Sequence, residues 1–258
     1  MPRTFLATLH FDGTDFVGWQ RQREGRTVQE EFEAVLARLA GQPVRGYAAG
    51  RTDTGVHAVG MAVSFALPDR WTPQSLERAL NGLLPRDIFV AAVREVRPGF
   101  NARRAATERR YRYLIGTDRE ARSPFRRPFE WALGIPLDPG RLADAAARIT
   151  GTHDFKALSV RRSTRPHTRC EVREAAWNAR PGTAGVEFRI RADRFLHHMV
   201  RMLVGTMVDV ALERRAAGDI DRLLEQDPEV RTSPPAPAQG LYFVTAVYPD
   251  EWFALPSD

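Results

Sequence analysis

Apolar residues recur along this chain at two alternating spacings, and this alternation limits the fold more than any other feature of the sequence. Residues 4–11 (TFLATLHF) alternate apolar and polar side chains, a period of two that is typical of a half-buried strand. Residues 27–41 instead repeat apolar side chains at helical spacing, between a capping-box pattern of Thr27 and Glu30 and a terminating Gly41. The chain must therefore pack amphipathic helices on sheets, which predicts the α+β class.

Strand-like and helix-like segments follow one another to the end of the chain, and the second half repeats the pattern of the first. We expect two similar α+β subdomains, residues 1–105 and 106–258, around a central, mostly antiparallel sheet flanked by helices. Amphipathic strands predict that each sheet is covered by helices on one face and open on the other. The further strands expected are 61–67, 87–96, 110–116, 170–177, 185–192 and 241–248, and the further helices are 72–84, 138–149, 195–215 and a short one capped by Asp219.

Composition indicates the broad class of the protein and the compartment in which it is expected. Its 43% apolar and 27% charged residues are ordinary for a globular chain of 258 residues. The single cysteine, Cys170, excludes an internal disulfide and a four-cysteine zinc site, and suggests a reducing compartment. With no apolar run of about 18 residues, we expect a cytoplasmic protein with no membrane-spanning segment.

The positive charge is concentrated in two segments. The formal net charge is +6, while residues 101–130 hold nine arginines and four acids, a net of +5. Residues 156–173 hold five arginines, one lysine and one acid, again a net of +5. This distribution indicates a polyanionic partner, and an open basic sheet face would suit RNA.

The most unusual local segment is GRTDTGVHA at residues 50–58. Two glycines bracket a carboxylate, an arginine and two hydroxyls just before an apolar strand. Such a loop can hold its backbone tightly and present Asp53 from a rigid element. In isolation, an aspartate between threonines is more often a turn or cap residue, so the chemical role depends on a partner.

A cationic partner for Asp53 is available in the apolar segment 195–211, where Arg201 is the only permanent charge before Asp209. A buried guanidinium needs an anion, and a carboxylate in a cleft needs a cation to stay ionised. We therefore predict that Asp53 and Arg201 pair. The alternative is that Arg201 lies on the exposed stripe of its helix.

Tyr111 and Tyr113 share one face of the strand 110–116, with Arg110 and Arg112 on the other. Aromatic rings interleaved with arginines can contact an unstacked base and its phosphates. An equally good interpretation from spacing alone is that both tyrosines belong to the core.

These segments together resemble the bacterial tRNA pseudouridine synthase A family. The matching motifs span nearly the whole chain in the family's order. They are DGTDFVGWQ (12–20), GRTDTGVHA (50–58), FNARRAATERRYRY (100–113), GTHDF (151–155), ADRFLHHMVRMLVG (192–205) and GLYFV (240–244). The chain departs from the family at Thr54, where alanine is common, and follows its pattern only loosely over residues 157–170.

The resemblance implies specific roles. Asp53 matches the catalytic aspartate, Tyr111 the tyrosine that contacts the target uracil, and Arg201 the arginine paired with the aspartate. Arg51 matches an arginine that helps to extrude the target nucleotide. The family has the pseudouridine synthase fold, forms homodimers, uses no metal or organic cofactor, and modifies the anticodon stem-loop of tRNA at positions 38 to 40. Asp53 would either attack C1′ of the ribose or remove the C2′ proton.

Three other functions were weighed against this one. The D-T-G triplet at residues 53–55 is that of aspartic peptidases, but that chemistry needs a second such carboxylate, and the chain has no second D-[ST]-G. A non-catalytic RNA-binding module would use the same basic surface without needing Asp53. A zinc site at His197 and His198 is disfavoured, because adjacent residues of a helix point about 100° apart.

Overall fold

The computed structural model describes residues 2–160 and 167–253 and divides them into two compact units. Unit 1 ends at Arg109 and resumes at Phe243, and unit 2 spans Arg110–Tyr242. Residues 243–258 are predicted to belong to the second half, but the described part of this segment belongs to unit 1. Residues 243–247 are part of the last strand, which lies beside the strand His57–Leu67 of unit 1.

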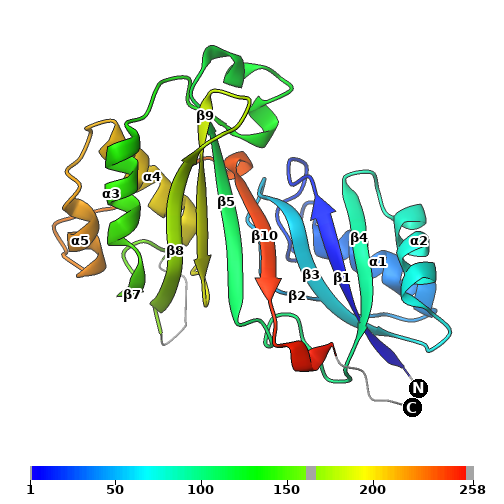
Figure 1. Ribbon diagram of the computed structural model, residues 1–258. Helices are drawn as coiled ribbons and strands as arrows, with labels where there is room; N and C mark the ends of the chain where they lie inside the picture. The colour runs from blue at the N-terminus through cyan, green and yellow to red at the C-terminus, as the bar shows by residue number, and fades with distance from the viewer. Residues whose placement is uncertain (1, 161–166, 254–258) are drawn as a thin grey trace. The chain divides into compact units, whose positions relative to one another are not determined.

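Unit 1 holds four main strands and two helices (Figure 1). The strand order is β4-β1-β3-β10, and β2 also pairs with β3. β1 pairs antiparallel with both β3 and β4, as β2 does with β3. The elements are β1 (Arg3–Phe11), α1 (Val28–Ala40), β2 (Tyr47–Ala48), β3 (His57–Leu67), α2 (Pro73–Leu83), β4 (Ile88–Val96) and β10 (Leu241–Val247).

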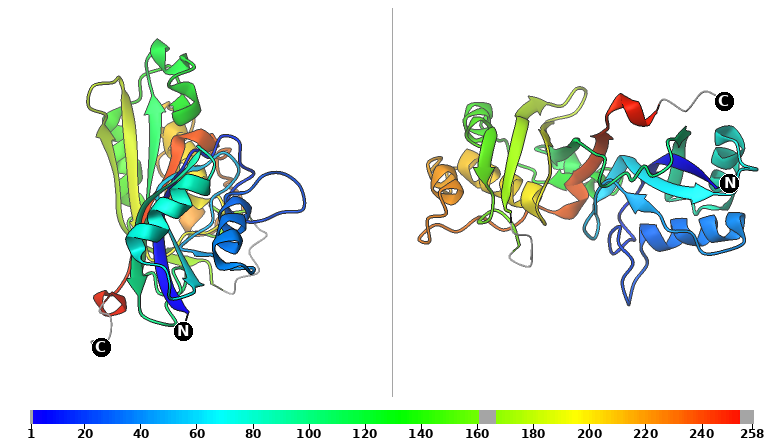
Figure 2. Two further views of the ribbon diagram at one scale, coloured as in Figure 1. Left: turned by 90° about the vertical axis from the view of Figure 1, so that its right-hand side faces the viewer. Right: turned by 90° about the horizontal axis from the view of Figure 1, so that it is seen from below.

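The core of unit 1 lies between α1 and the strands. Phe5 on β1 and Phe65 on β3 stack with ring centroids 6.2 Å apart, and Phe32 of α1 meets Phe65 edge-on at 5.5 Å. The face of β1 predicted to be buried is buried at each position, which confirms the period-two interpretation. Helix α2 packs on β4, and the left view of Figure 2 shows it in front of these strands.

Unit 2 holds the strand order β5-β9-β8-β7, with β6 beside β5. β8 pairs antiparallel with β7 and β9, whereas β5 and β6 pair in parallel. Helix α3 packs on β8, α4 and α5, and Figure 1 shows the three helices grouped beside β8. The elements are β5 (Glu108–Gly116), β6 (Trp131–Ala132), α3 (Pro139–Arg148), β7 (Gly151–Asp154), β8 (Arg169–Ala179), β9 (Gly185–Ala192), α4 (Met199–Ala211) and α5 (Asp219–Leu224).

The α+β class and the mostly antiparallel pairing are therefore confirmed, and three local predictions need correction. The helix expected over 195–215 is shorter, because His198 and Glu213 have left-handed backbones, with φ of 62° and 57°, that bound α4. Gly218, not Asp219, caps α5. Thr27 caps α1 by accepting the Glu30 N–H, but the capping box with both bonds occurs at α2, between Thr72 and Ser75.

None of the helices formed by residues 2–160 and 167–253 is both long enough and apolar enough to cross a membrane.

Candidate active site

Asp53 lies in the loop that joins β2 to β3 in unit 1. Its side chain is half-buried, Thr52 before it is buried, and Arg51 is exposed. The Asp53 carbonyl accepts the Val56 N–H at 3.1 Å, which closes a tight turn. Gly55 takes the third position of that turn with φ of 76°, a conformation that favours glycine. The second glycine of the motif is thus required by the turn that follows Asp53.

A second loop, residues 12–19, fixes the backbone on both sides of Asp53. Trp19 donates its N–H to the Thr52 carbonyl at 3.1 Å, and Gly55 donates its N–H to the Phe16 carbonyl at 3.2 Å. The rings of Phe16 and Trp19 are buried, with 1% and 3% exposed, and anchor this loop in the core. The residue before Asp53 and the second residue after it are therefore both tied to a buried segment.

Two glycines allow this close approach of one loop to the other. A Cβ on Gly13 would overlap the carbonyl oxygen of Val56. A Cβ on Gly18 would lie 2.6 Å from the Thr52 carbonyl oxygen, and Gly18 has a φ of 100°. Glycine has no Cβ, so it avoids both overlaps and readily adopts the positive φ of Gly18. We call these contacts between residues 12–19 and 52–57 the backbone clamp.

His57 completes the backbone clamp from the strand side. Its ring is buried, with 2% exposed, and its Nδ1 accepts the Gly13 N–H at 3.0 Å. Accepting this bond needs the Nδ1 lone pair, which places the ring proton on Nε2 in the neutral tautomer. An Asp12 carboxylate oxygen lies 3.2 Å from the same nitrogen.

The roles of residues 12–19 and of His57 were not predicted from the sequence, where DGTDFVGWQ was only one of the motifs that resemble the family. The usable signal was a pair of glycines alternating with large aromatic residues, which is unusual for a solvated loop.

In unit 2, the two tyrosines of β5 have different environments. Tyr113 is fully buried and donates its hydroxyl to the Pro237 carbonyl at 2.7 Å, so the core interpretation holds for this residue. Tyr111 is half-buried, and its ring meets Phe195 edge-on with centroids 4.9 Å apart. Of the pair, Tyr111 retains an exposed surface that could receive a base.

Arg201 lies in the first turn of α4 and is half-buried, which does not support a place on an exposed stripe. Its Nε donates to the Ala236 carbonyl at 2.7 Å, and Ala236 donates its N–H to the Arg201 carbonyl at 2.9 Å. Tyr113 holds the next carbonyl of the same segment. Burial raises the pKa of the Tyr113 hydroxyl well above its usual range, against a smaller opposing effect of the Arg201 charge.

The geometric argument against a zinc site at His197 and His198 is wrong. It assumed that both residues lie within a helix, but α4 begins at Met199. His198 has a left-handed backbone, and the two rings lie with their centroids 4.1 Å apart.

The predicted site residues fall in both units. Asp53 and Arg51 belong to unit 1, and Tyr111 and Arg201 belong to unit 2. The pairing of Asp53 with Arg201 stays a prediction. Part of the second basic segment, residues 161–166 with three of its arginines, lies outside the described residues.

Comparisons with known proteins bear on these observations. The family model described as "tRNA pseudouridine synthase" matches residues 7–103 and 145–249. Three relatives called tRNA pseudouridine synthase A are similar over nearly their whole length. The protein of Myxococcus xanthus is 40% identical (97% of this chain, 93% of the relative), that of Moorella thermoacetica 39% (91% and 95%), and that of Thermus thermophilus 39% (96% and 98%).

The matched residues include Arg51, Asp53 and Arg201, whereas Tyr111 lies outside them. The match and the relatives define an isomerase class of enzyme. The chain belongs to the tRNA pseudouridine synthase A family. It is therefore not an aspartic peptidase.

The backbone clamp generates a first prediction. Gly13→Ala should lower the free energy of unfolding by about 1–3 kcal/mol, because the new methyl group overlaps the Val56 backbone. The amide hydrogens of Trp19 and Gly55 should also exchange faster with solvent. Urea unfolding and hydrogen exchange measure the two effects.

Gly82→Ala is the matched control, because a Cβ there meets no atom within 4 Å and the site lies in α2. It should be neutral or stabilising by up to about 1 kcal/mol. Equal free energies of unfolding and equal amide exchange rates in Gly13→Ala and Gly82→Ala would contradict the proposed effect of the backbone clamp.

A second prediction concerns Tyr113. Tyr113→Phe leaves the buried Pro237 carbonyl without its donor, which should cost about 1–3 kcal/mol of stability. Tyr47→Phe, which changes an exposed tyrosine, should cost nothing measurable. Urea unfolding of both variants checks this prediction. An unchanged free energy of unfolding in Tyr113→Phe would show that the hydroxyl does not hold residues 236–237.

Proposed function

We propose that this enzyme isomerises uridine to pseudouridine in tRNA, at positions 38 to 40 of the anticodon stem-loop, with Asp53 as its catalytic carboxylate. Family membership supports the reaction and the kind of substrate. The motifs resembling the bacterial family support the anticodon position. The same resemblance supports a cytoplasmic homodimer that works without a metal or organic cofactor.

The observation that carries the role of Asp53 is the backbone clamp. A catalytic group must be held in its productive geometry by its surroundings. The clamp ties the backbone of residues 52 and 55 to a buried loop, while the side chain between them stays half-buried. A solvated turn residue would need no such support.

The reaction is a rearrangement that balances without a co-reactant. The bond between N1 of uracil and C1′ breaks, the base turns, and a bond from C5 to C1′ forms. The proton on C5 leaves, and N1 gains one, so no electrons are transferred. Asp53 acts in its ionised form, either as a nucleophile at C1′ or as a base at C2′.

The stacked bases of an RNA stem or loop hide C1′, so the target nucleotide must first leave the stack. Arg51 is exposed on the same loop as Asp53, two residues away, and is proposed to occupy the vacated space. Tyr111 is proposed to stack on the uracil. Phe195 contacts its ring edge-on and restricts its orientation.

Arg201 is proposed to keep Asp53 ionised and oriented, an electrostatic role that strengthens when water is excluded. Its guanidinium is held through Nε by the Ala236 carbonyl at 2.7 Å. The bond to Ala236 also fixes the direction of the guanidinium plane.

The role of Asp53 generates a third prediction. Asp53→Asn should abolish pseudouridine formation while leaving tRNA affinity nearly unchanged, because the change removes a charge and little shape. Asp15→Asn, in the exposed part of the neighbouring loop, is the control and should keep full activity. Single-turnover assays of pseudouridine in tRNA check both variants.

If Asp53→Asn kept more than about a tenth of the wild-type rate, Asp53 would not be the catalytic group. A tenfold loss corresponds to an increase of only about 1.4 kcal/mol in the activation barrier. An inactive variant with normal tRNA binding also excludes the alternative of a non-catalytic RNA-binding module.

A fourth prediction separates two roles of Tyr111. If its hydroxyl relays the C5 proton, Tyr111→Phe should bind tRNA normally but release tritium slowly from C5-labelled uridine. If the ring only stacks, release should stay close to wild type. Tyr111→Ala loses the stacking, worth about 1–3 kcal/mol per base, under either role and serves as the reference for binding. We expect slow release, and a wild-type rate would limit Tyr111 to stacking.

A further inference from the structure

Total charge does not locate an RNA-binding surface on this protein, because many of its arginines are already neutralised by acids. In unit 1, Arg26 pairs with Glu31 and Asp87, and Arg3 pairs with Glu95. In unit 2, Arg126 pairs with Asp118 and Glu130. A phosphate gains little from a guanidinium whose donors and charge are satisfied internally. The informative arginines are those that remain exposed without an acid beside them.

Arg45 and Arg104 are two of several such arginines in unit 1. Arg45 and Arg104 are exposed, and neither forms an ion pair with any residue in the part of the chain that the structure describes. Glu33 accepts the N–H of Gly46, the residue after Arg45, and the Gln29 side chain, and its ion pair is with Arg21.

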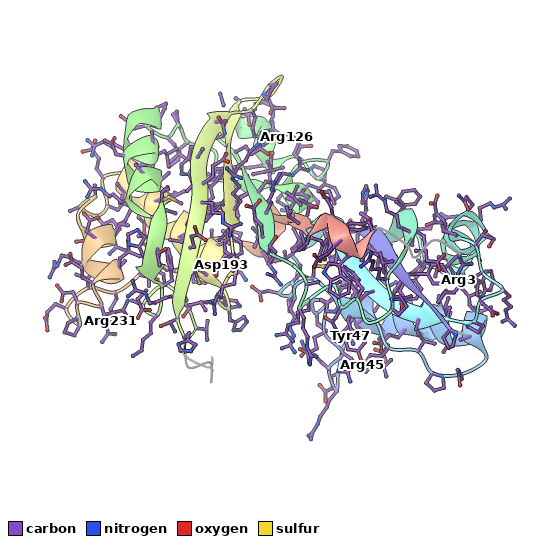
Figure 3. All side chains as sticks on the ribbon, turned by 60° about the horizontal axis from the view of Figure 1, so that its bottom comes forward. Arg3, Arg45, Tyr47, Arg126, Asp193 and Arg231 are labelled. Carbon is purple, nitrogen blue, oxygen red and sulfur yellow. The ribbon has the colours of Figure 1, made fainter. Side chains whose placement is uncertain are left out.

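Arg45 lies beside an exposed aromatic ring. The side chain of Tyr47 is 43% exposed, and the Arg45 guanidinium lies over its ring, 5.5 Å from the centroid. Figure 3 labels both side chains, which project from the same part of unit 1. A tyrosine so exposed contributes little to the core, while stacking with arginine holds its ring in place.

The segment 101–106 lies next to this pair. Tyr47 is opposite Ser64 in the register of β2 and β3, and Ser64 accepts the Ala102 N–H through its hydroxyl at 2.9 Å. Arg109 fixes the same junction by donating to the carbonyls of Ala49, at 3.2 Å, and Arg103, at 2.6 Å.

Asn101 also fixes the course of this segment. Its side-chain oxygen accepts the N–H groups of Arg103 and Arg104 at 3.0 and 3.1 Å. The exposed side chains of these two arginines therefore start from a fixed backbone beside Tyr47.

We infer that Arg45, Tyr47 and Arg104 form an RNA-contact surface on unit 1, here called the Tyr47 surface. Its ligand is an unpaired nucleotide of the tRNA substrate, which stacks on Tyr47 while its neighbouring phosphates bind the arginines. The inference rests on the proposed function, because it names how the same substrate is held next to the loop that carries Asp53.

The chemistry of the Tyr47 surface favours RNA over a protein partner. An aromatic ring flanked by guanidinium groups binds single-stranded nucleic acid by base stacking and by phosphate contacts. Protein interfaces of similar size are usually built around a larger apolar centre. Tyr47 begins the segment that leads to Arg51 and Asp53, so one stretch of chain carries both the Tyr47 surface and the Asp53 loop.

The test uses the full-length enzyme and unmodified tRNA. Tyr47→Ala should raise the Kd for tRNA by roughly 5- to 150-fold, which corresponds to the loss of one stacked base. Tyr47→Phe should stay within about twofold of wild type, because it keeps the ring. At saturating tRNA, the single-turnover rate of Tyr47→Ala should stay close to wild type, because the surface binds the substrate and takes no part in the chemistry.

Arg45→Gln and Arg104→Gln should each reduce the slope of log affinity against log salt by about 1. Two matched controls lie elsewhere on unit 1. Phe89 on β4 is 52% exposed, and Arg78 on α2 is exposed. Phe89→Ala and Arg78→Gln should leave both Kd and salt slope unchanged.

An unchanged Kd in Tyr47→Ala would overturn the inference, as would an equal loss in Phe89→Ala. A loss in Tyr47→Phe as large as in Tyr47→Ala would also overturn it, since the ring would not be the binding group. The proposed function is tested separately. It fails if Asp53→Asn keeps its activity, and this result does not depend on how the Tyr47 variants bind tRNA.

Discussion

The rest of the candidate site depends on the contact between two stretches of backbone, residues 12–19 and 52–57. A carboxylate on a loop is useful for catalysis only when the loop cannot relax, and this loop is bonded through Thr52 and Gly55 to a segment anchored in the core. Main-chain groups can approach so closely only where side chains are missing, which explains glycine at positions 13 and 18. The two motifs are therefore halves of one structural unit.

A comparable arrangement holds Arg201 in unit 2. There, a buried tyrosine and an arginine bind successive carbonyls of the proline-rich segment 234–240. Prolines stiffen this segment, because their rings fix the backbone φ. Tyr113 thus has a structural role that supports Arg201, while Tyr111, two residues earlier on the same face of β5, remains half-exposed. One strand thus supplies one buried and one half-exposed tyrosine.

The arginines show why composition alone is a weak guide to binding. The chain has 38 basic and 32 acidic residues, and many form ion pairs that satisfy the arginines internally. What distinguishes the surface around Tyr47 is an exposed ring that lies against Arg45, an arginine without an acid partner in the described structure, next to the segment that carries Arg104. On the proposed surface, the ring selects unpaired bases over stacked ones, and the charges give salt-dependent affinity.

The sequence by itself determined the secondary structure and the chemical types at the site. Period-two strands and capped helices such as Thr72–Leu83 follow from local rules, and the motif around Asp53 identified the family. Helix ends were less predictable, because the left-handed residues His198 and Glu213 carry no local signal in their side chains. Only the tertiary structure decided that residues 12–19 clamp the Asp53 loop, that Tyr113 is buried while Tyr111 is not, and that the final strand belongs to unit 1. The physical reason is that these features depend on contacts between segments far apart in the chain, which local periodicity cannot encode.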